Sequence, residues 1–196
     1  MATFTEIVTR VQSLLEVTEA SVPTLTISGW IGRAVGDISD IAERLPSLWD
    51  TLKTLQRTVE SEVSTAHRLE WPTNAVRVLG TGTVWGQSFG ALVRDSELPR
   101  PDLYKRPTGT SPWLVIGTDA TGQYLEVLPH IFATKKAQLH YIKRPEETDE
   151  FGDVLADLVV FQAAFLGAAE RGNNEKLAVS EKLFVNKLKL FTPEAA

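Results

Sequence analysis

Cysteine is absent from this chain of 196 residues. Its absence excludes disulfide bonds, zinc sites built from thiolates and catalysis by a cysteine nucleophile. It does not decide the cellular compartment, because a chain without cysteine suits an oxidising or a reducing environment. With 43% hydrophobic residues, the chain is long enough to build a substantial core, which must supply its stability.

Long apolar runs and an excess of positive charge are lacking too. The longest apolar run, residues 158–169, is interrupted by Gln162 and is shorter than the roughly 20 residues that span a membrane. Residues 1–10 lack the basic start and apolar run of a signal peptide. The formal net charge of −5 argues against a basic surface that grips nucleic acid, although DNA could still slide past the protein. We expect a soluble protein with no membrane partner.

Residues suited to metal or cofactor chemistry are few. His67, His130 and His140 have no second histidine or cysteine at ligand spacing, so we expect no metal site. The glycines between residues 80 and 86 do not match a dinucleotide-binding loop, and a sharply turning hairpin explains them. The sequence therefore predicts no cofactor.

Acidic residues gather at the start of one predicted helix. Asp149, Glu150, Asp153 and Asp157 suit the positive end of a helix dipole. Paired carboxylates can also act as acid and base, and together with His140 they would form the candidate site of a hydrolase. Because no dense catalytic constellation accompanies them, we expect that the protein is not an enzyme.

The spacing of apolar residues predicts four helices, two near each end of the chain. They cover about residues 5–17, 28–45, 149–171 and 174–190. The last two form a hairpin around Gly172, and the first of this pair is apolar over most of its surface, so we expect it to be largely buried. Thr3 and Glu6 have the spacing of a capping box before the first helix.

Short apolar runs separated by turn residues predict a β-region over about residues 51–143. Helices followed by strands and then by helices indicate an α+β fold rather than alternating βαβ units. We predict a helical bundle, made of the two N-terminal helices and the C-terminal hairpin, with an inserted antiparallel β-region. We expect residues 1–196 to form a single domain.

Two stretches allow more than one interpretation. Gly29, Gly32 and Gly36 make a smooth strip on the second helix, and we expect it to pack tightly against another helix. Within residues 48–62, Leu48, Leu52 and Leu55 have helical spacing, while the threonines nearby favour a strand.

Taken in order, these elements resemble the head-to-tail adaptor (connector) proteins of tailed bacteriophages. The resemblance is carried by a pattern of elements along nearly the whole chain. Its parts are the short first helix (residues 5–15), the second helix (27–38), the strand entry Leu69-Glu70-Trp71-Pro72, the stretch from Leu139 through Tyr141 to Arg144-Pro145, and the final hairpin (153–190). The resemblance also places the start of the β-region within residues 48–62, so we predict a strand from Leu52 to Val59.

What the resemblance implies is a structural virion protein. Such proteins form a usually dodecameric ring under the portal, extend the DNA channel and connect the head to the tail at the virion neck, after synthesis in the host cytoplasm. The implied partners are the portal protein, a tail or stopper protein, copies of the chain itself, and double-stranded DNA that passes without sequence-specific contact. The implied portal-docking segment is Lys187, Leu188, Lys189, Leu190 and Phe191.

Small basic patches are candidates for contacts with DNA in the channel or with a partner. They consist of Lys135, Lys136, Lys143 and Arg144, although solvated faces are the simpler interpretation. Alternative functions are a stopper or tail-completion ring protein, an acid/base hydrolase using the carboxylates named above, and a cellular interaction module.

Overall fold

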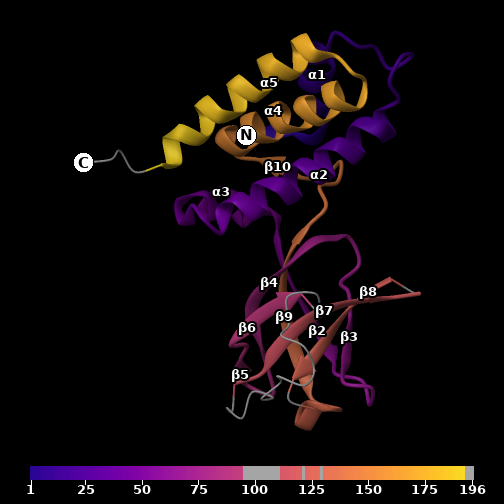
Figure 1. The fold of residues 1–196 in the computed structure, drawn as a ribbon, viewed down its shortest axis with the longest axis vertical. Coiled ribbons are helices and arrows are strands. Elements are labelled where there is room, and N and C mark those ends of the chain that lie inside the picture. Colours follow the sequence, from indigo (N-terminus) through magenta and orange to yellow (C-terminus); the bar gives the residue numbers. More distant parts are fainter. Residues whose placement is uncertain (95–110, 121, 129, 193–196) are drawn as a thin grey trace. The chain divides into compact units, whose positions relative to one another are not determined.

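The computed structural model of the chain describes residues 1–94, 111–120, 122–128 and 130–192. Helices and strands both contribute largely, and all strands except the short β1 at residues 2–3 lie between two groups of α-helices in sequence (Figure 1). The predicted α+β fold is therefore confirmed. The chain forms two compact units: Met1–Gln56 with Lys143–Ala196, called here the helical unit, and Arg57–Ile142, the β unit. The prediction of a single domain stays a prediction.

The helical unit contains the four predicted helices, with shifted ends. They are α1 (Phe4–Leu15), α2 (Thr24–Ala42), α4 (Asp153–Glu170) and α5 (Asn174–Leu188), followed by a 3₁₀ turn, η6 (Lys189–Phe191). Helix α2 begins four residues before the predicted start because Pro23, which suits a helix beginning, stands at its N-cap. Helix α4 begins later than predicted because β10 (Glu150–Phe151) pairs with β1 (Ala2–Thr3).

Helix α4 is the centre of the helical unit. It packs against α1, α2 and α5 (Figure 1), and nine of its residues are buried. The prediction that this helix is largely buried is confirmed. The capping box is confirmed as well: the Glu6 backbone N–H donates to Thr3 Oγ1, and the Thr3 N–H donates to the Glu6 carboxylate at 2.7 Å. Apolar periodicity and a local cap thus define this unit from its sequence.

Residues 46–62 correct one prediction. The chain continues in helical turns through η1 (Pro46–Leu48), α3 (Trp49–Leu52) and η2 (Lys53–Leu55), and β2 begins only at Gln56 and ends at Glu62. The predicted strand over Leu52–Val59 is therefore wrong for its first four residues. Leu48, Leu52 and Leu55 are all fully buried, and their spacing of four and three satisfies a helix rather than a strand.

The β unit contains two four-stranded sheets. One has the order β2-β9-β4-β5 and the other β3-β8-β7-β6. The strands after β2 are β3 (Arg68–Glu70), β4 (Ala75–Val84), β5 (Gln87–Ser88), β6 (Ala91–Arg94), β7 (Trp113–Asp119), β8 (Gly122–Leu128) and β9 (Lys136–Lys143). Strands β6 and β7 pair in parallel, so the prediction of a purely antiparallel region is wrong for this pair. The other strand pairs whose register is defined are antiparallel.

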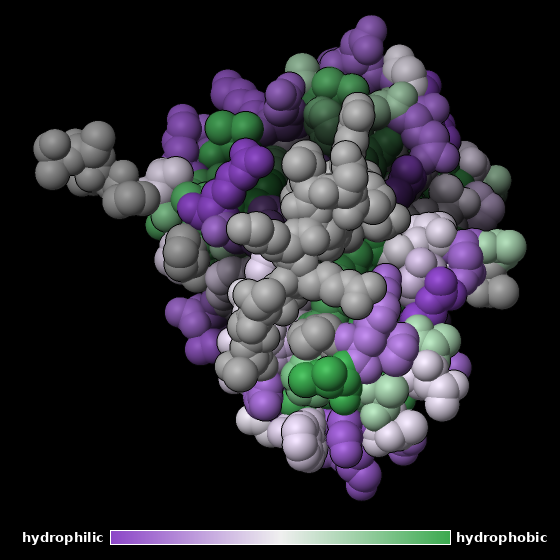
Figure 2. Space-filling view, turned by 60° about the horizontal axis from the view of Figure 1, so that its bottom comes forward, coloured by the Kyte–Doolittle hydropathy of each residue, from purple (hydrophilic) through white to green (hydrophobic). Residues whose placement is uncertain are grey.

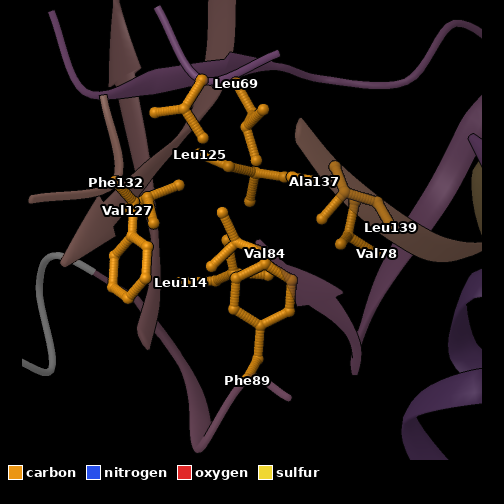
Figure 3. Packing of buried hydrophobic residues seen from close by; sticks show 11 residues of the cluster. Leu69, Val78, Val84, Phe89, Leu114, Leu125, Val127, Phe132, Ala137 and Leu139 are labelled. Atoms are coloured by element: carbon orange, nitrogen blue, oxygen red, sulfur yellow. The ribbon is translucent and has the colours of Figure 1, made fainter. Parts of the chain in front are cut away.

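The core of the β unit lies between these two sheets (Figure 3). One sheet contributes Leu69, Leu114, Leu125 and Val127. These side chains lie on the inner face of that sheet, since alternate residues of a strand lie on the same face. The other sheet contributes Val78, Val84, Ala137 and Leu139, and Phe132 of the 3₁₀ turn η5 (His130–Phe132) is fully buried in the same cluster. The opposite faces of the strands are therefore left to carry polar groups.

Candidate functional site

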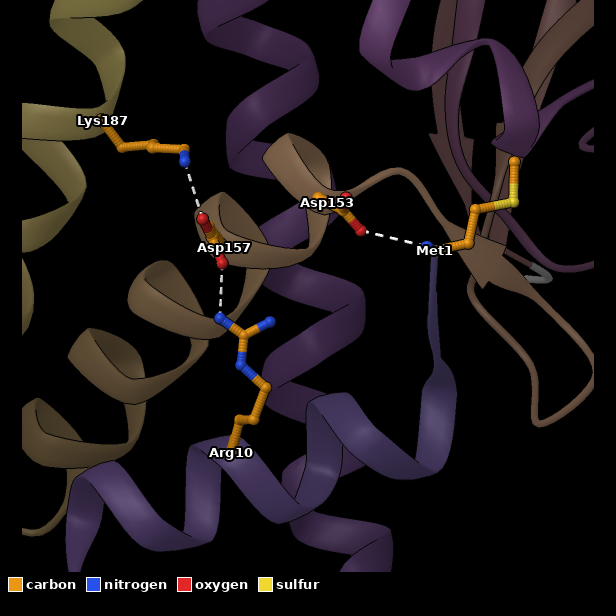
Figure 4. Close-up of polar contacts among 5 residues, drawn as sticks. All are labelled: Met1, Arg10, Asp153, Asp157 and Lys187. Atoms are coloured by element: carbon orange, nitrogen blue, oxygen red, sulfur yellow. Dashed lines mark hydrogen bonds and ion pairs between the residues drawn. The ribbon is translucent and has the colours of Figure 1, made fainter.

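Asp157 joins three helices through charge pairs (Figure 4). Its carboxylate lies between Lys187 of α5, whose Nζ is 2.7 Å away, and the guanidinium of Arg10 on α1. Asp153, one turn earlier on α4, lies 3.1 Å from the Met1 amino group and is largely exposed. Packing of α1 and α5 against α4 brings these groups together across long sequence separations.

The surroundings of Asp157 favour its ionised form. Burial of the carboxyl group raises the pKa of Asp157, but the hydrogen bonds and charges of Lys187 and Arg10 outweigh this effect and hold the pKa below its ordinary value. A carboxylate held ionised between two cations is suited to fixing helices in place rather than to exchanging a proton. We therefore assign it a structural role.

Replacement of Asp157 by asparagine is expected to lower the free energy of unfolding at pH 7 by about 1–2 kcal/mol, because it removes a half-buried charge from two cationic partners. The folded-state pKa is depressed, so the stabilisation is fully present above the unfolded pKa of about 3.9 and is lost as pH falls through the folded value. Urea unfolding at stepwise lower pH measures this.

The matched control is Asp153→Asn on the same helix, where the carboxylate is exposed and a change within about 0.5 kcal/mol is expected. If Asp157→Asn matched wild type at pH 7, or if its deficit persisted in acid, the role assigned to Asp157 would be wrong.

The predicted portal-docking segment is folded at the end of the helical unit. Lys187 and Leu188 finish α5, and Lys189, Leu190 and Phe191 form η6. Lys187 is held by Asp157, and the Phe191 carbonyl accepts a hydrogen bond from Ser47 Oγ at 3.3 Å. Leu190, in contrast, is 68% exposed. Leu190 is therefore the apolar side chain of this segment that is most available to a partner.

The four basic candidates have different surroundings. Lys143 Nζ lies 2.8 Å from the carboxylate of Asp149, and its side chain is only 12% exposed. Its charge is therefore already paired within the helical unit. The side chain of Arg144 packs over Gly32 of α2. In the β unit, Lys135 Nζ lies 4.8 Å from the centre of the Trp85 ring, and Lys136 begins β9 and is exposed. The two pairs thus belong to different units.

The glycine strip of α2 does not pack as predicted. Only Gly32 is covered, by the side chain of Arg144, and a side chain added at Gly29 or Gly36 would meet nothing within 4 Å. The expected close contact with another helix is therefore wrong for Gly29 and Gly36, and at Gly32 the nearest side chain, Arg144, does not belong to a helix. A different glycine, Gly167 of α4, makes the tight helix contact, against Trp30 of α2.

The candidate carboxylates of the hydrolase hypothesis have structural surroundings. Asp149 is buried, pairs with Lys143 and accepts the Glu146 backbone N–H at 2.8 Å. Glu150 lies in the short strand β10, where it pairs with Thr3. His140 belongs to the β unit, where its Nδ1 lies 3.2 Å from Thr81 Oγ1. Among the described residues, no three histidines or carboxylates gather as metal ligands.

Exposed large hydrophobic side chains occur in both units. On the face shown in Figure 2, hydrophobic residues lie in separate areas among hydrophilic ones. Three of the exposed ones, Val179, Val185 and Leu190, belong to α5 and η6. Ser180 and Phe184 are the buried side chains of α5, and Leu177, Leu183 and Leu188 of the same helix are partly buried.

A cleft of about 640 Å³ in the β unit was not predicted from the sequence. Its lining includes Arg68, Glu70, Trp71, Asp119 and Tyr124. The alternation of Arg68 and Glu70 around buried Leu69 would have placed the first two on one face of a strand. Which residues of β8 lie beside Arg68 and Glu70 depends on the strand register, in which Glu70 is opposite Tyr124. The sequence does not predict this register.

Comparison with known proteins adds no family to this geometry. No protein-family model matches the chain, and no curated protein matches it. Within the described residues, no helix is long and apolar enough to cross a membrane.

Proposed function

We propose that this chain is a structural virion protein of a tailed bacteriophage, a head-to-tail adaptor that assembles as a ring under the portal. In this role it connects the head to the tail and extends the channel through which DNA passes. Two helices, a β-region and a final helical hairpin follow one another in the order of that family. The resemblance also implies a dodecameric ring and a location at the virion neck, and both are part of this proposal.

The observation that carries the proposal is the exposed apolar side chain of Leu190 at the end of the chain's helical hairpin. Helix α5 packs against α4, and the pair Lys187–Asp157 joins the two helices, while Leu190 beyond them is 68% exposed. An exposed apolar side chain at the end of a helix is suited to entering a groove on another protein. Leu190 belongs to the segment that the family resemblance assigns to portal docking.

The charge of the chain is compatible with a DNA channel. A net charge of −5 repels the phosphate backbone overall and lets DNA slide without sticking. Lys135 and Lys136 remain the candidates for local contact with DNA or with a tail protein, since Lys143 is engaged by Asp149. The pairing of Asp149 with Lys143 gives the hydrolase alternative less support.

Binding order distinguishes an adaptor from a stopper or tail-completion protein. In co-sedimentation, the purified chain is expected to join isolated portal rings in the absence of any tail component. Binding only to portal rings that already carry another neck protein would indicate that the chain is a stopper protein. Failure to bind both bare portal rings and portal rings that carry another neck protein would contradict the proposal.

A further inference from the structure

The cleft of the β unit has a floor of contacting residues. Tyr124 of β8 lies across Gly117 of β7, where a Cβ would fall 2.4 Å from the Tyr124 ring. On its other side, the Arg68 guanidinium stacks at 3.7 Å from the ring centre and donates to the Asp119 carboxylate at 2.9 Å. Gly117, Tyr124, Arg68 and Asp119 therefore form a stack of contacts along the floor of the cleft.

Hydrogen-bonding groups without partners surround this floor. Within the described residues, the side chains of Glu70 and Gln123 and the hydroxyl group of Tyr124 make no hydrogen bond to the protein; Glu70 and Gln123 are exposed at the cleft, where a ligand could replace the water around them. Gln123 and the Tyr124 hydroxyl can donate and accept, and Glu70 accepts. Such a set matches a ligand whose own groups both donate and accept, as hydroxyl groups do.

One wall of the cleft is aromatic. The half-buried indole of Trp71 packs against the core cluster of the β unit, and its Nε1 donates to the Ala75 carbonyl at 3.4 Å. Trp71 is thereby held in place while it lines the cleft. A fixed aromatic surface beside polar groups suits a ligand with one apolar and several polar sides.

The charges of the cleft select against anions. Among the described residues that line the cleft, two are carboxylates, Glu70 and Asp119, and one is a cation, Arg68, which pairs with Asp119. A phosphate or carboxylate ligand would meet the uncompensated charge of Glu70. The volume of about 640 Å³ lies within the range of small-molecule sites.

We propose that this cleft binds a neutral saccharide, with the hydroxyl groups contacting Glu70, Gln123 and the Tyr124 hydroxyl and the sugar ring lying against Trp71. The proposal is independent of ring assembly, because every residue involved belongs to the β unit. It adds a ligand site to a chain whose proposed role is otherwise structural.

Saturation-transfer NMR with the full chain tests the site. The probes are glucose, galactose, N-acetylglucosamine and their short oligomers, with glucose 6-phosphate as the anionic counterpart. At least one neutral probe is expected to bind at millimolar concentration or below, and more tightly than the phosphate. Gln123→Ala and Glu70→Gln, which change exposed side chains, are each expected to weaken binding about tenfold.

Trp71→Ala is expected to weaken binding as well, and Trp85→Ala is its matched control. Trp85 is an exposed tryptophan of the same unit that does not line the cleft, so its loss is expected to leave affinity unchanged. The site is disproved if no neutral saccharide binds, if glucose 6-phosphate binds more tightly than glucose, or if Gln123→Ala and Glu70→Gln bind like wild type. The Gln123 and Glu70 variants decide the matter even if Trp71→Ala fails to fold.

Discussion

Deletion of residues 188–196 is expected to abolish binding of the chain to portal rings while leaving both units folded. Among the described residues removed, Leu188 and Phe191 are partly buried, Phe191 accepts one bond from Ser47, and Leu190 is largely exposed. The buried residues of α5, Ser180 and Phe184, and the Lys187–Asp157 pair all remain. Co-sedimentation with portal rings measures binding, and circular dichroism with urea unfolding checks the fold.

A point variant locates the effect more sharply. Leu190→Asp places a charge where the proposal expects an apolar contact, and a loss of at least about thirtyfold in affinity is expected of an interface anchor. Leu25→Asp is the matched control, because Leu25 on α2 is 84% exposed and lies outside the docking segment. Unchanged binding after the deletion, or equal losses in the two aspartate variants, would refute the docking assignment.

Two glycine-to-alanine changes are expected to shift stability in opposite directions. At Gly167, an added Cβ would lie 2.6 Å from the Trp30 ring and 2.9 Å from a Leu15 methyl group. The Trp30 ring cannot easily move away from the added Cβ, since it is buried and its Nε1 donates a hydrogen bond to the Glu170 carboxylate at 2.7 Å. Gly167→Ala is therefore expected to lower the free energy of unfolding by about 2 kcal/mol through overpacking.

Gly36→Ala is the matched change in an open position. Nothing lies within 4 Å of the new Cβ, so the higher helix propensity of alanine is expected to raise the free energy of unfolding by up to about 1 kcal/mol. Urea unfolding of the two variants beside wild type measures both shifts. Gly167→Ala as stable as wild type would contradict the tight contact between α2 and α4.

Local signals in the sequence were sufficient for much of the helical unit. Apolar periodicity gave the four helices, and the Thr3–Glu6 spacing gave the capping box, because both depend on neighbours within one or two turns. The same periodicity was correct for Leu48, Leu52 and Leu55, which are buried in helical turns. The strand predicted there from family resemblance began four residues too early.

Features that depend on distant pairings were not accessible in this way. Arg10 and Asp157 are 147 residues apart, and Gly167 contacts Trp30 only because α4 packs on α2. The parallel pairing of β6 with β7 and the register that sets Tyr124 beside Glu70 likewise have no local signature. The sequence therefore indicated the helices and the fold class, while the saccharide cleft required the three-dimensional arrangement.

Particle mass in solution tests the adaptor proposal most directly. Light scattering would be applied to the chain alone and to the chain mixed with a portal ring from the same source. The proposal predicts a ring-sized particle, or a defined mass added to the portal that corresponds to a whole number of chains. A persistent monomer that leaves the mass of the portal ring unchanged would contradict it.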